Sequence, residues 1–263
     1  MMLNFFARPK LDPVAQDWIF ENFTWLMREF GGGGEFNKST LVLPKPGFFP
    51  IDGETGDARA QKVFQAIKDY AGMGDWPVTL VADDDPKAIR GEPSLVSIQH
   101  GTHALGRFVA DQDGAMITYT PMLLAEPMQL IGTLAHELSH YLLCTGKTDP
   151  PSDEDENEYL TDLCTVFLGF GVFLANTRFN TEVVAMGPMS GVGWRQSGYL
   201  PEPELVFATA LFLKVQGIDP AEAQNFLKPH LAKALKHAFK DLEGAPEIAT
   251  LRELADRNAM PAD

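Results

Sequence analysis

Residues 131–143 read Ile-Gly-Thr-Leu-Ala-His-Glu-Leu-Ser-His-Tyr-Leu-Leu, and this stretch organises the rest of the chain. Its apolar residues recur at the spacing of one helical face. Pro127 upstream suits a first helical turn, and Gly146 downstream suits a C-terminal cap. The pattern predicts a helix over about 127–144. His136 and His140 stand at positions i and i+4, which places both imidazoles on one face of that helix.

Two imidazoles on one face, with a glutamate beside them, form the His-Glu-x-x-His pattern of zinc hydrolases. The ring nitrogens of His136 and His140 can bind one cation. Glu137 lies next to that face, where its carboxylate can reach a water molecule without binding the metal. We therefore expect a Zn²⁺ site in which Glu137 is the general base.

A catalytic zinc site needs a third protein ligand and one open position. Glu158 and Asp162 stand at i and i+4 in the next predicted helix, about residues 153–176. We expect Glu158 to be the third ligand and Asp162 to accept the second ring N–H of a ligand histidine. The segment before Glu158 is densely acidic, so Glu154 and Glu156 remain alternative ligands.

Together, the two motifs resemble the gluzincin metallopeptidases, including the catalytic core shared by the thermolysin-like and Ste24/Oma1-like groups. The resemblance covers roughly residues 115–177 and implies a zinc peptidase acting on peptide or protein substrates. It also implies a zincin-like core, with the third ligand and its supporting aspartate on the second helix. The chain has no Gly-x-Met-Glu-Asn aminopeptidase signature and no flanking membrane helices.

A hydrolase of this kind needs a donor that stabilises the oxyanion. Tyr199 is our first choice, together with Arg195, because both follow the ligand helices in a glycine-rich stretch. Three further candidates remain open, namely Tyr119, His230 and His237. Two other functions remain open as well: a hydrolase of non-peptide amides or small peptides, and a catalytically idle zincin-like module serving protein interaction.

The remaining pattern predicts an α+β fold. We expect a small, mostly antiparallel sheet packed on the two ligand helices, and a helical C-terminal region. A single domain over 1–263 would comprise a helical and irregular part (1–75), the catalytic core (76–177) and a helical part (178–263). Strands are predicted at 77–82, 94–99, 106–110 and 115–120, and further helices at 13–30, 57–70, 203–216, 220–243 (broken or kinked at Pro229) and 246–257.

The net charge, the cysteines and the apolar runs of the chain disfavour several classes of protein. The formal net charge of −15 disfavours nucleic acid as a partner. Two cysteines, Cys144 and Cys164, cannot build a disulfide framework, and we expect both to be small buried core residues. The longest apolar run, residues 163–175, falls short of the roughly 18 residues of a membrane span. We therefore expect a soluble, cytoplasmic protein without a membrane span.

Overall fold

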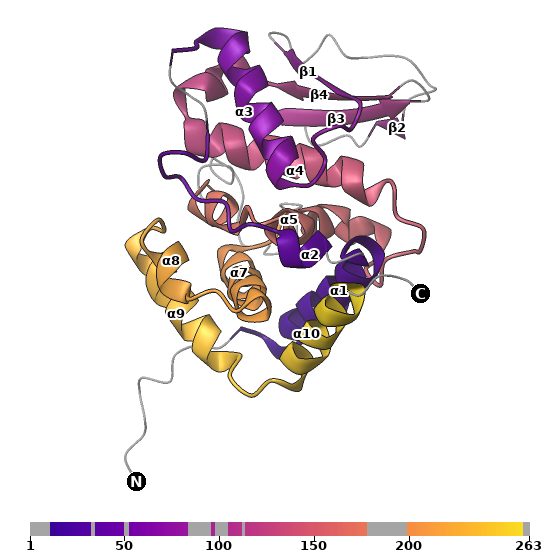
Figure 1. Cartoon of the computed structure of the whole chain (residues 1–263), viewed down its shortest axis with the longest axis vertical. Helices are drawn as coiled ribbons and strands as arrows, with labels where there is room; N and C mark the ends of the chain where they lie inside the picture. Colours follow the sequence, from indigo (N-terminus) through magenta and orange to yellow (C-terminus); the bar gives the residue numbers. More distant parts are fainter. Residues whose placement is uncertain are drawn as a thin grey trace, which may run out of the picture.

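The computed structural model describes residues 11–32, 35–49, 53–83, 96–97, 105–111, 114–177 and 199–259. Within these ranges the fold is α+β, as predicted, with many helices and one small sheet (Figure 1). The helices are α1 (Pro13–Phe30), α2 (Glu35–Lys38), α3 (Gly56–Tyr70), α4 (Pro127–Leu143), α5 (Asn157–Phe167), α7 (Glu202–Gln216), α8 (Pro220–Gln224), α9 (Pro229–Asp241) and α10 (Pro246–Ala259). The strands are β1 (Val78–Ala82), β2 (Val96–Ser97), β3 (Gly106–Asp111) and β4 (Gly114–Tyr119).

The sheet has the strand order β1-β4-β3-β2. Strands β3 and β4 form the predicted antiparallel hairpin, with Phe108 opposite Ile117. Val96 and Ser97, the described residues of the predicted strand 94–99, form β2 and pair antiparallel with β3. The pairing of β1 with β4 is parallel, with Val78 opposite Ala115, so the sheet is mixed. Strand β4 therefore lies between its hairpin partner β3 and the earlier strand β1.

The sheet lies on α4, and α5 lies on the opposite side of α4 (Figure 1). This corrects the prediction that the sheet packs on both ligand helices. Phe108 and Ile117, whose side chains are buried, point from the hairpin toward the core. Helices α1 and α7 pack against α5, so α4 and α5 sit in the middle of the molecule between the sheet and the helical layer. A helix with neighbours on both sides holds its side chains rigidly, which suits a metal site.

The second ligand helix is shorter than predicted. A 3-10 turn, η3 (Glu154–Glu156), precedes α5, and a further helical stretch covers 171–177 after a break. The break comes at Gly169, whose φ of 96° is a left-handed conformation that favours glycine. A Cβ on Gly169 would lie 2.1 Å from the carbonyl oxygen of Thr40, and the Gly169 carbonyl accepts a hydrogen bond from Val42. The glycine therefore lets the backbone of an N-terminal segment pass directly against this turn.

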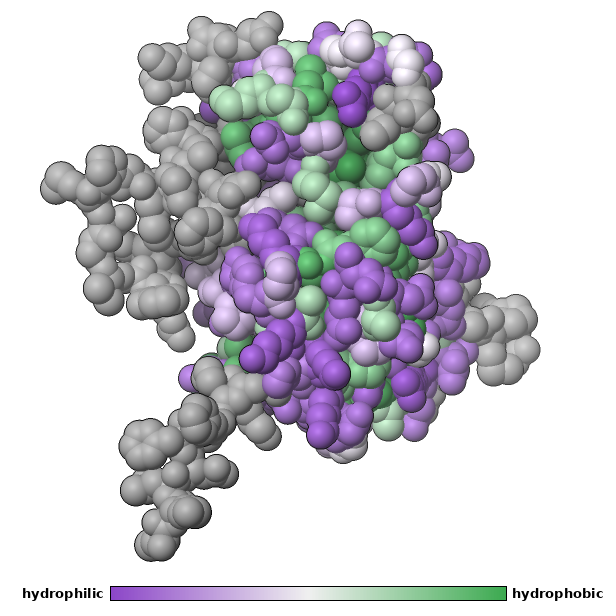
Figure 2. Space-filling view, turned by 90° about the vertical axis from the view of Figure 1, so that its left-hand side faces the viewer, coloured by the Kyte–Doolittle hydropathy of each residue, from purple (hydrophilic) through white to green (hydrophobic). Residues whose placement is uncertain are grey.

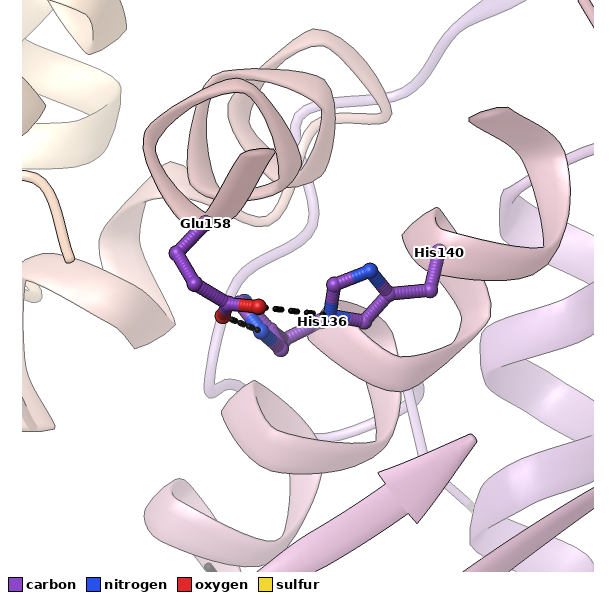
Figure 3. Close-up of side chains that lie close together, drawn as sticks. All are labelled: His136, His140 and Glu158. Carbon is purple, nitrogen blue, oxygen red and sulfur yellow. Dashed lines mark hydrogen bonds and ion pairs between the residues drawn. The ribbon is translucent and has the colours of Figure 1, made fainter. Parts of the chain in front are cut away.

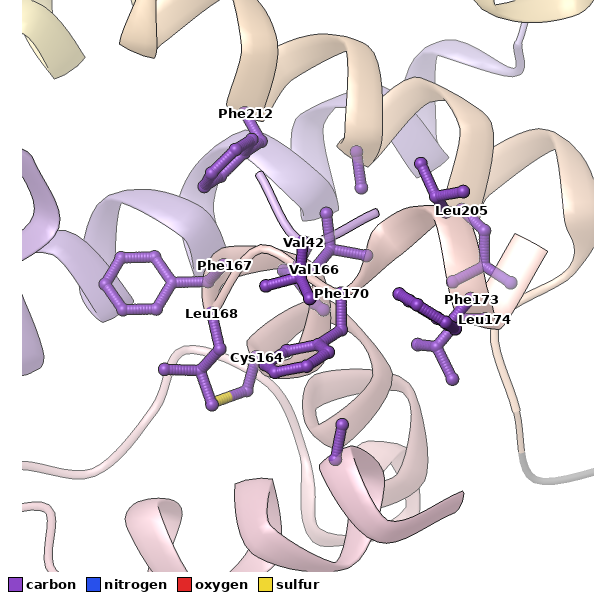
Figure 4. Packing of buried hydrophobic residues seen from close by; sticks show 14 of the residues in the cluster. Val42, Cys164, Val166, Phe167, Leu168, Phe170, Phe173, Leu174, Leu205 and Phe212 are labelled. Carbon is purple, nitrogen blue, oxygen red and sulfur yellow. The ribbon is translucent and has the colours of Figure 1, made fainter. Parts of the chain in front are cut away.

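Gly171 allows close packing against α7, because an added Cβ would lie 2.4 Å from Thr209 Oγ1 on that helix. Around this turn the core is built from aromatic and aliphatic side chains contributed by several helices (Figure 4). Phe36 and Phe167, for example, stack with ring centroids 5.0 Å apart. This packing fixes the far end of α5 and leaves its first turn, which carries Glu158, near the surface.

The described part of the C-terminal region, residues 199–259, is mainly helical as predicted, and the predicted break is present, because α8 ends at Gln224 and α9 begins at Pro229. Hydrophilic residues cover most of the lower part of the face in Figure 2, where these C-terminal helices lie. No helix in the described part of the chain is long and apolar enough to cross a membrane.

Candidate metal centre

Helix α4 presents both histidines from a buried position. His136 is 5% exposed and His140 is 2% exposed. Leu134 and Leu138, on the faces of α4 that enter the core, are completely buried and fix the rotation of the helix. The rings of His136 and His140 lie with centroids 4.8 Å apart, as expected for residues one turn apart.

Glu158, in the first turn of α5, points toward both rings (Figure 3). Its Oε2 lies 3.2 Å from Nε2 of His136, and its Oε1 lies 3.6 Å from Nε2 of His140. One ligand atom from each of the three residues can be chosen so that all lie within 4.8 Å of one another. Ligands about 2.1 Å from a tetrahedral ion are about 3.4 Å apart, so the contacts of Glu158 have the spacing of a shared metal ion.

Asp162 orients His136 through a hydrogen bond. The side chain is completely buried, and its Oδ1 lies 2.9 Å from Nδ1 of His136. Its Oδ2 accepts a hydrogen bond of 2.9 Å from the backbone N–H of Leu200. Both carboxylate oxygens are therefore engaged, and His136 is held with Nδ1 toward Asp162 and Nε2 toward Glu158. This is the arrangement in which a histidine offers Nε2 to a metal.

Thr161 plays the same part for His140, and the sequence analysis did not find it. The Thr161 hydroxyl donates its proton to the carbonyl of Asn157, so it can only accept from Nδ1 of His140, 3.2 Å away. With Nδ1 toward Thr161, His140 turns its Nε2 toward Glu158. Its place in the sequence could have identified it. Thr161 follows Glu158 by one helical turn and directly precedes Asp162, so it faces α4.

The carboxylates around His136 favour a positive charge at this site. Burial by itself would lower the pKa of His136, but the hydrogen bonds with Asp162 and Glu158 and the charges of Asp162 and Glu137 raise it to about 10. Without a metal ion, a proton on His136 thus compensates for the buried carboxylates. A divalent cation would take over that role once the proton has left.

Glu137 is also buried, at 2% exposure, and its carboxyl lies next to the start of β3. A Cβ on Gly106 would meet Glu137 Oε1 at 3.1 Å, so the glycine leaves room for this carboxyl. Burial raises the pKa of Glu137 to about 7, with Glu158 raising it further and His136 and Arg107 opposing. Among the described residues, no hydrogen-bond partner satisfies the buried Oε2 of Glu137.

The predicted stabilising residue Tyr199 lies at the site, with its ring centroid 5.6 Å from that of His136. Of the alternatives, Tyr119 donates its hydroxyl to Asp57, and His230, 62% exposed, pairs with Glu202. His237 lies on α9, and Arg195 lies outside the described residues.

The acidic segment contributes only Glu158 to the cluster. Glu156 is engaged elsewhere, because its Oε2 accepts a hydrogen bond of 2.9 Å from the indole of Trp18. Glu154 is exposed in the preceding turn. Of the cysteines, Cys164 is buried as predicted, whereas Cys144 is exposed, because it follows the last residue of α4.

Together, these residues define the class of site: a His-His-Glu group, with both histidines buried and Glu158 half-buried, that could bind a metal ion. Comparisons of the chain with protein-family models, curated proteins and solved structures found no match. The chemistry of the site therefore has to be argued from its own residues.

We expect Asp162→Asn to weaken zinc binding by about 10- to 100-fold, because His136 loses the anion that fixes its ring and raises its basicity. The dissociation constant can be measured by competition with a chromophoric chelator. Asp219→Asn is the matched control, because Asp219 caps α8 through the N–H of Ala221 and asparagine also caps well. An unchanged affinity in Asp162→Asn would remove Asp162 from the site.

Zinc binding is expected to release protons at neutral pH. Below its raised pKa of about 10, His136 carries a proton that the metal must displace, so the apparent affinity falls with falling pH. The decrease should be about tenfold per pH unit for each displaced proton. Calorimetry in buffers of different ionisation enthalpy counts the released protons, and no release at pH 7 would contradict the protonation of the metal-free site.

Proposed function

We propose that the protein is a zinc-dependent hydrolase, most specifically a peptidase, in which Glu137 is the general base. The observation that carries this proposal is the buried carboxyl of Glu137, whose Oε2 lacks a partner within the described structure and whose neighbours are the His-His-Glu group. A buried carboxylate without a partner is costly and needs a reason. A site that only stored a metal would have no use for it.

The donor set suits zinc. Two imidazole nitrogens and one carboxylate are the protein ligands of many catalytic zinc sites, where a fourth position stays open. Glu158 is the most exposed of the three, at 21% for its side chain, so solvent reaches the group from the side of Glu158. When bound, zinc would supply a Lewis acid that polarises a carbonyl and lowers the pKa of water.

Different residues of the chain then orient the metal ligands and transfer the proton. Asp162 and Thr161 hold the two rings in the tautomer that offers Nε2. Glu137 accepts the proton of the attacking water and passes it to the leaving nitrogen, a role for which its raised pKa of about 7 is suited. Gly106 leaves the space in which the Glu137 side chain lies, because an added Cβ would meet its Cγ at 3.0 Å.

Tyr199 is the candidate for stabilising the oxyanion. Its ring lies beside His136, and the following residue, Leu200, is tied through its backbone N–H to Asp162. The backbone next to Tyr199 is therefore anchored to the same carboxylate that orients the histidine. The phenolic O–H is a donor at neutral pH, as an oxyanion requires.

The test of this function is metal-dependent cleavage of a dye-labelled casein by the purified protein. We expect cleavage that a chelator stops and stoichiometric zinc restores. Zinc binding with no cleavage of casein or of a short-peptide mixture would favour the catalytically idle, zincin-like interaction module instead.

A further inference from the structure

We infer that helix α1 positions the third metal ligand, and that Trp18 is its principal positioning residue, acting through Glu156. This inference rests on the metal centre of the proposed function. It concerns the connection between the two ligand helices, residues 144–156, and what holds it in place.

Glu158 is the least constrained member of the metal group. His136 and His140 lie within a buried helix, whereas Glu158 stands in the first turn of α5, one residue after the helix begins. The first turn of a helix lacks the full set of backbone hydrogen bonds and frays more readily than the middle. The position of the Glu158 carboxylate therefore depends on the preceding turn, η3.

Trp18 holds that turn. Its indole Nε1 donates a hydrogen bond of 2.9 Å to Oε2 of Glu156, the last residue of η3. The same oxygen accepts from the backbone N–H of Asp153 at 3.3 Å, which closes the turn as a capping box. The Trp18 ring also lies edge-on to Tyr159, with centroids 6.3 Å apart, so Trp18 contacts Glu156, two residues before Glu158, and Tyr159, directly after it.

The other end of α1 holds the beginning of the connection. Trp25 Nε1 donates to Thr148 Oγ1 at 3.0 Å, and the Thr148 hydroxyl donates to Glu29 Oε2 at 2.8 Å. The second carboxylate oxygen of Glu29 accepts from the backbone N–H of Lys147. Helix α1 thus binds the connection at two places, and only the Trp18 contact adjoins the metal ligand.

The body of α1 is anchored independently of these contacts. Ile19, Phe23 and Leu26 are completely buried, and Phe23 packs edge-on to Phe167 of α5 with centroids 5.7 Å apart. Loss of one indole hydrogen bond should therefore leave α1 in place and loosen only the turn that it holds. Because α1 packs on α5 through Phe23 and Phe167, Trp18 links the position of α1 to Glu158 through Glu156.

The test is the affinity of the full-length protein for Zn²⁺, measured by competition with a chromophoric chelator, in Trp18→Phe and in Trp25→Phe. Each variant keeps an aromatic ring and loses one indole donor. We expect about a tenfold weaker affinity for Trp18→Phe, in the lower part of the range for residues that orient metal ligands, and less than about a twofold change for Trp25→Phe.

Glu156→Ala provides a second variant on the other side of the same contact. It removes the contact with Trp18 and also the hydrogen bond from the N–H of Asp153, so it should weaken zinc binding at least as much as Trp18→Phe does. The double variant should bind zinc as tightly as Glu156→Ala alone, because Trp18 acts through Glu156. Substitution with Co²⁺ adds a spectroscopic readout: the visible absorption of the bound ion should change in Trp18→Phe and stay as in the wild type in Trp25→Phe.

Equal affinities of the wild type and Trp18→Phe, or equal losses in the two tryptophan variants, would overturn the inference while leaving the metal centre intact. Additive effects of Trp18→Phe and Glu156→Ala would overturn the route through Glu156. A wild-type protein that binds no zinc would overturn the proposed function itself, and this inference with it.

Discussion

Replacing Glu137 by glutamine should lower turnover of a peptide substrate by about 10³-fold, within the range attributed to a general base, while zinc content stays unchanged. Glutamine has nearly the same shape, so it fits the space that Gly106 leaves. Its amide cannot accept the proton of the attacking water. The measurement is kcat/KM on dye-labelled casein, with zinc content determined on the same samples.

Glu154→Gln is the matched control for this experiment, because it makes the same chemical change on an exposed residue of the neighbouring turn η3. Its kcat/KM should equal that of the wild type. Turnover that persists in Glu137→Gln at the wild-type level would show that another group takes the proton, and the role assigned to Glu137 would be wrong.

The second large effect concerns stability. A zinc concentration 1,000 times the dissociation constant should stabilise the folded protein by about 4 kcal/mol, because the metal binds a site that exists only in the folded state. For a chain of this size that corresponds to a rise in Tm on the order of 10 °C. The site joins α4 to α5, which lie at the centre of the fold, so the gain should appear in the global transition.

His140→Ala should abolish this zinc-dependent rise, whatever its effect on the metal-free protein. The informative quantity is therefore the difference in Tm between zinc and chelator within each variant. His230→Ala is the control, because His230 is exposed on α9 and pairs with Glu202. A rise in Tm that survives in His140→Ala would place the bound zinc elsewhere.

Much of the candidate site could be predicted from local spacing. The i and i+4 pattern of His136 and His140 requires only a helix to bring the two rings together, and α4 provides it within one residue of the predicted end. Glu158 and Asp162 follow the same rule on α5. Periodicity is a local property, so it survives without knowledge of the tertiary structure.

What could not be predicted depends on long-range contacts. The choice of Glu158 over Glu156 depends on Trp18, which lies 138 residues earlier in the chain. The hydrogen bond from Leu200 to Asp162 uses a backbone N–H, so the pattern of side chains does not predict it. The parallel pairing of β1 with β4 was missed for the same reason: it is a tertiary choice between strands that are distant in sequence.

The break of the helix at Gly169 was not predicted either, for a different reason. The apolar run 163–175 favours one continuous helix through both of its glycines. Gly171 makes a close packing contact, but Gly169 ends α5 with a positive φ and admits the backbone of Thr40. A glycine within an apolar helical pattern can serve either purpose, and only the neighbouring chain decides between them.

The central claim is that His136, His140 and Glu158 hold one zinc ion. The most direct test is elemental analysis of the purified protein after zinc is supplied and excess metal is removed, for the wild type, Glu158→Ala and His140→Ala. We expect about one zinc per chain in the wild type, as for a three-ligand catalytic site, a reduced content in Glu158→Ala and none in His140→Ala. A wild-type protein without zinc, or variants that retain it in full, would contradict the account.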